Sequence, residues 1–226
     1  MRSDEFWNYF SQITQPKLAD RSETFEHIFN YLDQFDRPVG IVETGCVRVP
    51  DNWSGDGGST ILFDDYARTH PGSVVYTVDL DAGATRICRG LVSDCVKIHT
   101  GDSVPYLQSI ADNPPADLPF LDLVYLDSYD LDLNNPVPSA VHHLKELIAI
   151  SPHIRSETLI VVDDSPDIIT GFNHGGTFRI LTGPQVKNPH IGGKGMYIAE
   201  YAQQVGARNL FKSYQCGWTH MRVNKR

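Results

Sequence analysis

Two short apolar segments that end abruptly on acidic residues limit what this chain can fold into. One is LDLVYLDSYD, residues 121–130, and the other is LIVVDD, residues 159–164. Runs of apolar and β-branched residues of this length are typical of strands that are buried on both faces of a parallel sheet. Ligands of open α/β sheets bind at the carboxyl ends of such strands, so the acids at these ends are candidate site residues.

The same pattern occurs three times earlier in the chain. Apolar stretches at 39–42, 74–78 and 96–98 lead to acids, which are Glu43, Asp79 and Asp102. Helical segments are expected between the strands, at residues 60–69, 82–91, 104–111 and 139–150. This alternation predicts an α/β protein with a doubly wound, mostly parallel sheet and helices on both faces.

The segments that flank this pattern differ in character. Residues 1–38 are expected to form a helical cover, because apolar residues from Phe25 to Leu32 recur at helical spacing. Residues 165–193 are rich in Gly, Pro, Asn and His, and we interpret them as a loop inserted over the active site. The remaining expected elements are a strand-like run at 177–181, a helix at 194–205 and final strands at 209–215 and 220–224.

Composition argues against several classes of protein. A chain of 226 residues is long enough for one sizeable α/β domain and short for two, so we assign 1–226 to a single domain. A net charge of −9 without a basic stripe argues against nucleic acid as a partner. No stretch approaches the roughly 18 apolar residues of a membrane span, and the four cysteines lack zinc or disulfide spacing. We expect a cytoplasmic protein with reduced thiols.

Three of the acids form a candidate metal site. Asp127, Asp163 and Asp164 follow two of the predicted strands, and their carboxylates would converge at one edge of the sheet. Three oxygen ligands suit a hard divalent cation such as Mg²⁺ or Mn²⁺. The alternative is that Asp164 and Ser165 cap a following helix and that Asp127 is solvated.

The first two strand ends suggest a nucleoside ligand. Asp79, some thirty residues after the loop at Gly45, is placed to accept both hydroxyls of a ribose, and a glycine lets the backbone approach a ligand. The fingerprint GxGxxG is absent after the first strand, which disfavours a nicotinamide cofactor. An acidic rim that binds an adenosine with a cationic group suits S-adenosylmethionine.

At this point the chain resembles a known family. The order and spacing of ETG, VDLD, GDS, LDLVYLDSYD and VVDDS resemble the class I S-adenosylmethionine-dependent methyltransferases. Within them, the chain is most similar to metal-dependent O-methyltransferases, such as catechol O-methyltransferase and the macrocin-type enzymes that methylate sugars on antibiotics. The resemblance covers residues 39–165 well. It implies a Rossmann-like, seven-stranded sheet that is mostly parallel with the last strand antiparallel.

The resemblance also implies roles for individual residues. It implies that the cofactor is bound by Glu43, Thr44, Gly45, Ser59, Asp79, Asp102, Ser103 and Asp127. Within this set, Gly45 would lie beside the methionine part and Ser59 would touch its carboxylate. Asp79 would hold the ribose, while Asp102 and Ser103 would lie by the adenine. The metal ligands would be Asp127, Asp163 and Asp164.

The position of the general base departs from the family pattern. Three residues after the first metal ligand, the related families carry a lysine or a histidine, and this chain has Asp130. Asp130 is therefore the first candidate for the base, although it could also be a metal or substrate ligand. His143, its neighbour His142 and the inserted loop are the alternatives.

The resemblance further implies the acceptor, which we expect to be a sugar hydroxyl of a glycan or glycoside, for example on a deoxyhexose such as rhamnose. Asn52, Trp53 and Asp56 could wall a sugar pocket, or form a structural loop with a packed Trp. The alternatives are a catechol acceptor, a nucleotide-sugar glycosyltransferase that uses the Asp79-Leu80-Asp81 motif, and a domain that binds cofactor without turnover. A homodimer or membership of a larger glycan-synthesis protein is also expected.

Overall fold

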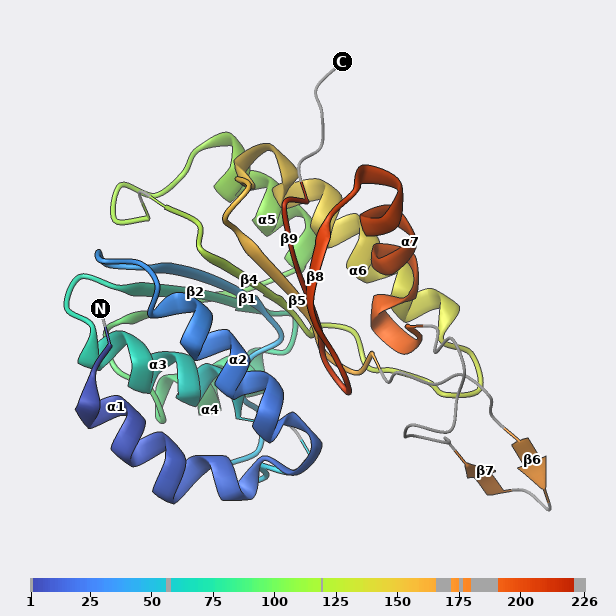
Figure 1. Ribbon diagram of the computed structural model, residues 1–226, viewed down its shortest axis with the longest axis horizontal. Coiled ribbons are helices and arrows are strands. Elements are labelled where there is room, and N and C mark those ends of the chain that lie inside the picture. Colours follow the sequence, from blue (N-terminus) through green and yellow to red (C-terminus); the bar gives the residue numbers. More distant parts are fainter. Residues whose placement is uncertain are drawn as a thin grey trace.

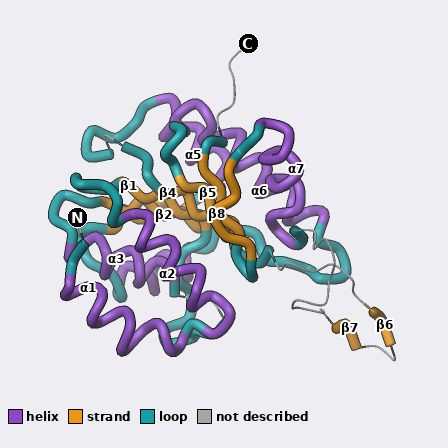
Figure 2. The backbone as a smooth tube through the Cα atoms, in the orientation of Figure 1, coloured by secondary structure: helices purple, strands orange, loops and turns teal. Residues whose placement is uncertain are grey.

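The computed structural model of the protein describes residues 2–55, 58–118, 120–165, 172–174, 177–179 and 191–221. A central sheet lies between two layers of helices (Figure 1; the helices are purple and the strands orange in Figure 2). Within these described residues, no helix is both long and apolar enough to cross a membrane.

The central sheet has seven strands in the order β3-β2-β1-β4-β5-β9-β8. Their bounds are β1 Gly40–Thr44, β2 Val74–Asp79, β3 Val96–Thr100, β4 Leu123–Leu126, β5 Leu159–Val162, β8 Arg208–Lys212 and β9 Cys216–Thr219. The strands from β3 to β5 pair in parallel, and β9 runs antiparallel to both of its neighbours. This topology confirms the predicted fold class, a doubly wound and mostly parallel sheet whose last strand is antiparallel.

Helices cover both faces of this sheet (Figure 1). On one face lie α1 Asp4–Tyr9, α2 Ser22–Leu32, α3 Ser59–Thr69 and α4 Ala82–Arg89. On the other face lie α5 Ser103–Asp112, α6 Val137–Ile150 and α7 Met196–Val205. Because each face is covered, the central strands are buried on both sides, and this explains their continuous apolar sequences.

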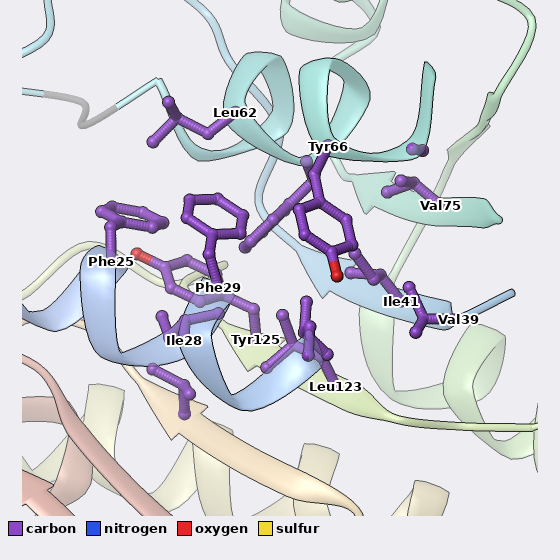
Figure 3. Close-up of a cluster of buried hydrophobic side chains, with 14 of the residues drawn as sticks. Phe25, Ile28, Phe29, Val39, Ile41, Leu62, Tyr66, Val75, Leu123 and Tyr125 are labelled. Atoms are coloured by element: carbon purple, nitrogen blue, oxygen red, sulfur yellow. The ribbon is translucent and has the colours of Figure 1, made fainter. Parts of the chain in front are cut away.

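An aromatic core joins the N-terminal helices to the sheet. Phe25 and Phe29 of α2 are fully buried, and Phe25 stacks on Tyr125 of β4 with ring centroids 5.8 Å apart. Figure 3 shows Phe29 between Phe25 and Tyr66 of α3, on which Phe29 stacks with ring centroids 5.3 Å apart. The helical spacing of apolar residues from 25 to 32 therefore marks a face that packs on the sheet, as expected for the N-terminal segment.

The predicted position of the final strand is wrong. We expected it at 220–224, but β9 spans Cys216–Thr219, and His220 has a φ of +61°, which ends the strand. All four residues of β9 are buried, so its sequence lacks the alternation that marks a half-exposed strand. Residues 222–224 lie outside the described residues, as does most of the loop 165–193. Within that loop, β6 Phe172–His174 pairs antiparallel with β7 Thr177–Arg179.

Phe29→Ala should lower the free energy of unfolding by about 3–5 kcal/mol, because it removes a fully buried ring from the core between α2 and the sheet. Chemical denaturation followed by circular dichroism measures this change. The matched control is Ile148→Ala, since the Ile148 side chain on α6 is 60% exposed and should contribute about 0.5 kcal/mol or less. Equal effects of the two substitutions would contradict this assignment of the core.

Candidate active site

A polar pocket lies at the carboxyl ends of the parallel strands. Its lining includes six residues that the sequence singled out, which are Gly45, Ser59, Asp79, Asp127, Asp130 and Asp164. The parallel topology brings these residues together, because strands that run in the same direction end at the same edge of the sheet.

The three predicted metal ligands converge beside this pocket. One ligand atom from each of Asp127, Asp163 and Asp164 lies within 4.8 Å of the other two. Main-chain hydrogen bonds continue from the sheet, with Asp127 N–H donating to Thr44 O at 3.0 Å. Asp164 has a φ of +41°, a conformation that costs energy for a residue with a side chain. The three carboxylates therefore lie together at the carboxyl edge of the sheet.

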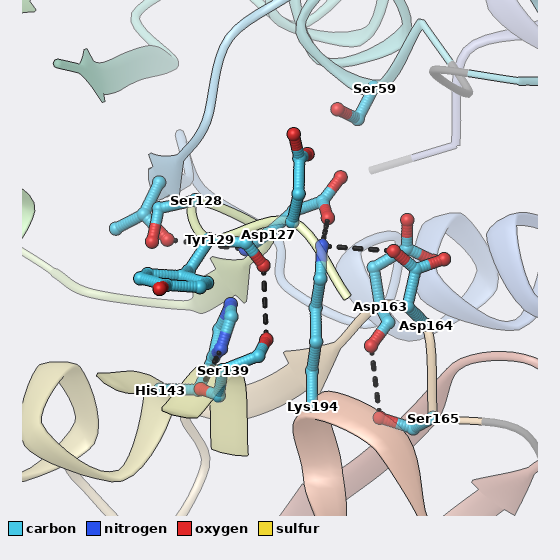
Figure 4. Close-up of polar contacts among 12 residues, drawn as sticks. Ser59, Asp127, Ser128, Tyr129, Ser139, His143, Asp163, Asp164, Ser165 and Lys194 are labelled. Atoms are coloured by element: carbon cyan, nitrogen blue, oxygen red, sulfur yellow. Dashed lines mark hydrogen bonds and ion pairs between the residues drawn. The ribbon is translucent and has the colours of Figure 1, made fainter. Parts of the chain in front are cut away.

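Two basic side chains from distant parts of the chain reach this cluster (Figure 4 shows Lys194). The guanidinium of Arg21 donates to both carboxylate oxygens of Asp163, with Nε at 3.0 Å from each, and its Nη2 lies 3.2 Å from Asp164. The ammonium of Lys194 makes an ion pair with Asp127 and lies 2.9 Å from Asp164 Oδ2. Each of the three carboxylates thus has a cationic partner within the protein.

The short helix Gly193–Gly195 positions Lys194. Gly193 has a φ of +50°, and a Cβ at this position would lie 2.0 Å from the carbonyl oxygen of Asp164. This close approach lets Lys194 N–H donate to the same carbonyl at 3.1 Å. The Lys194 side chain is 2% exposed, and although burial alone would lower its pKa, the carboxylates of Asp127 and Asp164 raise it above the usual value. Lys194 is therefore a permanent cation at neutral pH.

The loop after β1 forms the other half of the pocket. Gly45 has a φ of +81°, and a Cβ there would lie 2.5 Å from the carbonyl oxygen of Asp127, so a side chain has no space. Its neighbour Cys46 donates its N–H to Asp79 Oδ2 at 3.1 Å, and Asp81 N–H donates to the other oxygen at 2.8 Å. These bonds hold the Asp79 carboxylate at the pocket. Its contact with a ribose stays a prediction.

Glu43 is turned into the protein interior and away from the pocket. Its fully buried carboxylate accepts hydrogen bonds from the hydroxyls of Ser59, Thr60 and Thr77 at 2.6–2.8 Å. Burial raises the pKa of Glu43 to about 7, although the three hydroxyls oppose this shift. Glu43 thus ties β1 to β2 and to the start of α3, and in this way supports the loop after β1.

Thr44, Asp102 and Ser103 lie near the pocket without lining it. Thr44 is buried and donates to Glu146 Oε2 at 3.2 Å. Asp102 caps α5 by accepting from Val104 N–H at 2.9 Å. Ser103 lies 3.0 Å from His142 Nε2. Their contacts with the cofactor stay predictions.

The two candidate general bases have unfavourable surroundings. Asp130 lies at the rim with its side chain 73% exposed, and the hydrogen-bonded Arg48 lowers its pKa, which makes it a weaker proton acceptor. His143 is completely buried in α6, its Nδ1 bonds to Ser139 O at 2.7 Å, and burial lowers its pKa to about 4. His143 does not line the pocket.

Sequence reasoning missed the basic residues of the site, Arg21, Arg48 and Lys194. Arg21 is 142 positions from Asp163, and only the packing of the N-terminal helices brings the two together. Lys194 follows two glycines in IGGKG, and this tight backbone was the only local signal for it. Trp53, which we considered as a wall for a sugar, is partly buried against the aromatic core, and Asp56 lies outside the described residues.

Comparison with known proteins supports the fold. No family model and no curated protein matches the chain. Among solved structures, the chain is similar to the MycE methyltransferase from the mycinamycin biosynthetic pathway in complex with Mg and SAH, with a TM-score of 0.50 and 19% identity. The match covers 73% of this chain and 38% of MycE, so the chain corresponds to well under half of that protein.

Two further matches extend over nearly the whole chain at lower scores. DesVI of Streptomyces venezuelae has a TM-score of 0.46 and 10% identity, covering 96% of this chain and 97% of DesVI. The DhpI–SAH complex has a TM-score of 0.42 and 11% identity, covering 95% and 93%. From the strand order and the match to MycE, the chain has the Rossmann-like fold of the class I S-adenosylmethionine-dependent methyltransferases.

Glu43→Gln should change how stability depends on pH. The raised pKa means that the native state binds more protons than the unfolded chain between about pH 4.5 and 7, so the contribution of Glu43 to stability falls as the pH rises through this window. Relative to Glu43→Gln, the wild type should lose up to about 3 kcal/mol between these limits. Urea denaturation of both proteins at a series of pH values measures the difference, and a constant difference would show that the pKa of Glu43 is ordinary.

Proposed function

We propose that the protein is an S-adenosylmethionine-dependent O-methyltransferase that acts on a sugar hydroxyl of a glycan or glycoside. One observation carries the proposal. The bare backbone at Gly45 and the carboxylate of Asp79 share a pocket with the charged cluster of Asp127, Asp164 and Lys194. A nucleoside site thus adjoins a site for polar chemistry, in a fold that it shares with the MycE methyltransferase.

The residues of the loop after β1 fit the cofactor. A Cβ at Gly45 would collide with the backbone of Asp127 and Ser128, so this glycine lets the loop after β1 lie directly against the end of β4 at the pocket. Asp79 presents a carboxylate that two backbone N–H groups orient, and it can accept hydrogen bonds from a ribose. The pocket lining carries four carboxylates, those of Asp79, Asp127, Asp130 and Asp164, against three basic side chains, those of Arg21, Arg48 and Lys194. This small excess of negative charge favours a cationic sulfonium over a phosphate.

S-adenosylmethionine supplies a methyl group on a positively charged sulfur, which a hydroxyl oxygen can attack in line with the C–S bond. The protein must then align the acceptor oxygen and receive its proton. Asp130 stays the predicted base, and its pairing with the Arg48 guanidinium means that it would have to leave this partner to accept a proton well. His143 would need an opening of α6, because its ring is buried.

The predicted magnesium site has suitable ligands, but basic side chains already occupy them. Asp127, Asp163 and Asp164 are suitable ligands by chemistry and by spacing. However, Arg21 binds both oxygens of Asp163, which is 0% exposed, and Lys194 bonds the other two carboxylates. The residues as arranged therefore do not fit a divalent ion.

The contacts of Asp79 and Asp81 argue against the alternative that the protein is a glycosyltransferase. In the Asp79-Leu80-Asp81 motif, a metal and a diphosphate would need both carboxylates. Asp81 instead caps α4 by accepting from Gly83 N–H at 2.6 Å, while Asp79 is bonded to the loop after β1. The catechol acceptor stays the alternative within the same chemistry. Cytoplasmic location and assembly as a homodimer or within a larger glycan-synthesis protein belong to the proposal as well.

Asp79→Ala should weaken the binding of S-adenosylmethionine and of its demethylated product by about 1–3 kcal/mol, because it removes the acceptor for ribose hydroxyls. Isothermal titration calorimetry measures the loss. Asp112→Ala is the matched control, since Asp112 is an exposed carboxylate at the end of α5 and should leave affinity unchanged. Binding of nucleotide sugars in place of S-adenosylmethionine would overturn the proposed function.

The acceptor and the base can be tested together. Purified protein should methylate glycosides and leave dihydroxybenzenes unchanged when both are assayed with radiolabelled S-adenosylmethionine. Asp130→Asn should lower turnover about 10²-fold if Asp130 takes the proton, with cofactor affinity nearly intact. Arg48→Ala should then raise the pH at which turnover reaches half its maximum, since Arg48 lowers the pKa of Asp130. Normal turnover by Asp130→Asn would exclude Asp130 as the base.

A further inference from the structure

Lys194 lies at the place where the sequence predicts a metal ion. Its Nζ contacts Asp127 and lies 2.9 Å from Asp164, and these are two of the three predicted metal ligands. The third, Asp163, receives the Arg21 guanidinium. Figure 4 shows the Lys194 side chain extending from its short helix to the carboxylates.

Two basic side chains already supply the positive charge that a divalent metal ion would bring to the three carboxylates. Lys194 and Arg21 together bring the same formal charge as one divalent cation to the three carboxylates. A divalent ion added to this arrangement would leave the cluster positive and would place like charges in contact, which is unfavourable in a buried site. Binding an ion therefore requires that Lys194 leave.

The backbone opposes such a displacement. Lys194 belongs to the short helix Gly193–Gly195, and Gly193 lets this helix lie against the carbonyl of Asp164. The Lys194 side chain is 2% exposed. Tyr214 Oη also donates to Asp164 Oδ1 at 2.6 Å, and Arg21 shares this oxygen. Asp164 thus has several partners inside the protein, and a rotation of Lys194 away from the cluster would remove the ammonium from two largely buried carboxylates, Asp127 and Asp164.

We propose that Lys194 is the resident cation of the active site and that the protein transfers methyl groups without a divalent metal. The proposal rests on the proposed function. Lys194 lines the pocket, and the recorded bonds of its ammonium to described residues, with Asp127 and Asp164, leave one of its three N–H groups for the acceptor oxygen. That N–H would orient the hydroxyl and stabilise negative charge as it develops on the oxygen.

Metal binding tests the proposal without any assay of activity. Wild-type protein titrated with Mn²⁺ and followed by electron paramagnetic resonance should show no bound ion at millimolar concentration. Lys194→Ala should gain one Mn²⁺ site, because it leaves three carboxylates with a single cationic partner, Arg21. Lys145→Ala is the control, since Lys145 is exposed on α6 and its removal changes the net charge equally. If the wild type binds one Mn²⁺ per chain and Asp127→Asn abolishes this binding, the proposal is overturned.

The wild-type titration decides the question even if Lys194→Ala fails to fold. If that variant folds, as judged by circular dichroism, and still binds no ion, Lys194 does not occupy a cation site and the proposal is also overturned. The double variant Lys194→Ala/Asp127→Asn removes one charge of each sign and should not gain the Mn²⁺ site.

Activity provides a second arm. Methyl transfer by the wild type should be unchanged in excess chelator, and Lys194→Ala should lose at least about 10²-fold in kcat while its affinity for S-adenosylmethionine changes little. Loss of wild-type activity in chelator with recovery on addition of Mg²⁺ would refute the resident cation. Failure of the wild type to bind S-adenosylmethionine by calorimetry would instead refute the proposed function, and the Mn²⁺ titration would still report on Lys194.

Discussion

The pairing of buried carboxylates with Arg21 and Lys194 is the interaction on which the rest of the site depends. Uncompensated charges in a protein interior cost several kcal/mol each, so Asp127, Asp163 and Asp164 need cations wherever the fold places them. The basic partners come from opposite ends of the chain, one from the N-terminal helices and one from the segment before α7. The charge pairing therefore ties both flanking segments to the central strands.

The parallel sheet determines where the charged cluster and the pocket lie. The ends of β1, β4 and β5 lie side by side because these strands are parallel and adjacent, and each is followed directly by residues of the site. Close approach of the loop after β1 to the end of β4 is possible only because Gly45 lacks a side chain. Glu43 and Thr44, which lie one step earlier, point inward and hold the loop to β2, α3 and α6. Residues of one short motif thus divide between structural support and the lining of the pocket.

Two cationic side chains change how the acidic cluster should be understood. Carboxylates at strand ends suggest a metal when only the acids are considered, and the spacing of the three agrees with that interpretation. With Arg21 and Lys194 in place, the same carboxylates form a network of ion pairs that positions an ammonium group in the pocket. Electrostatic stabilisation of a reacting oxygen can be supplied by either kind of cation.

The sequence by itself determined the class of fold and the place of the site. Runs such as LDLVYLD and LIVVDD indicated buried parallel strands, and their terminal acids indicated the edge of the sheet at which the polar pocket lies. Local pattern was insufficient for β9, where full burial removed any alternation. Only the tertiary structure decided which charges oppose the acids, because Arg21 and Asp163 are 142 positions apart. Contacts of this kind depend on how whole elements pack, and no periodicity within a single segment encodes them.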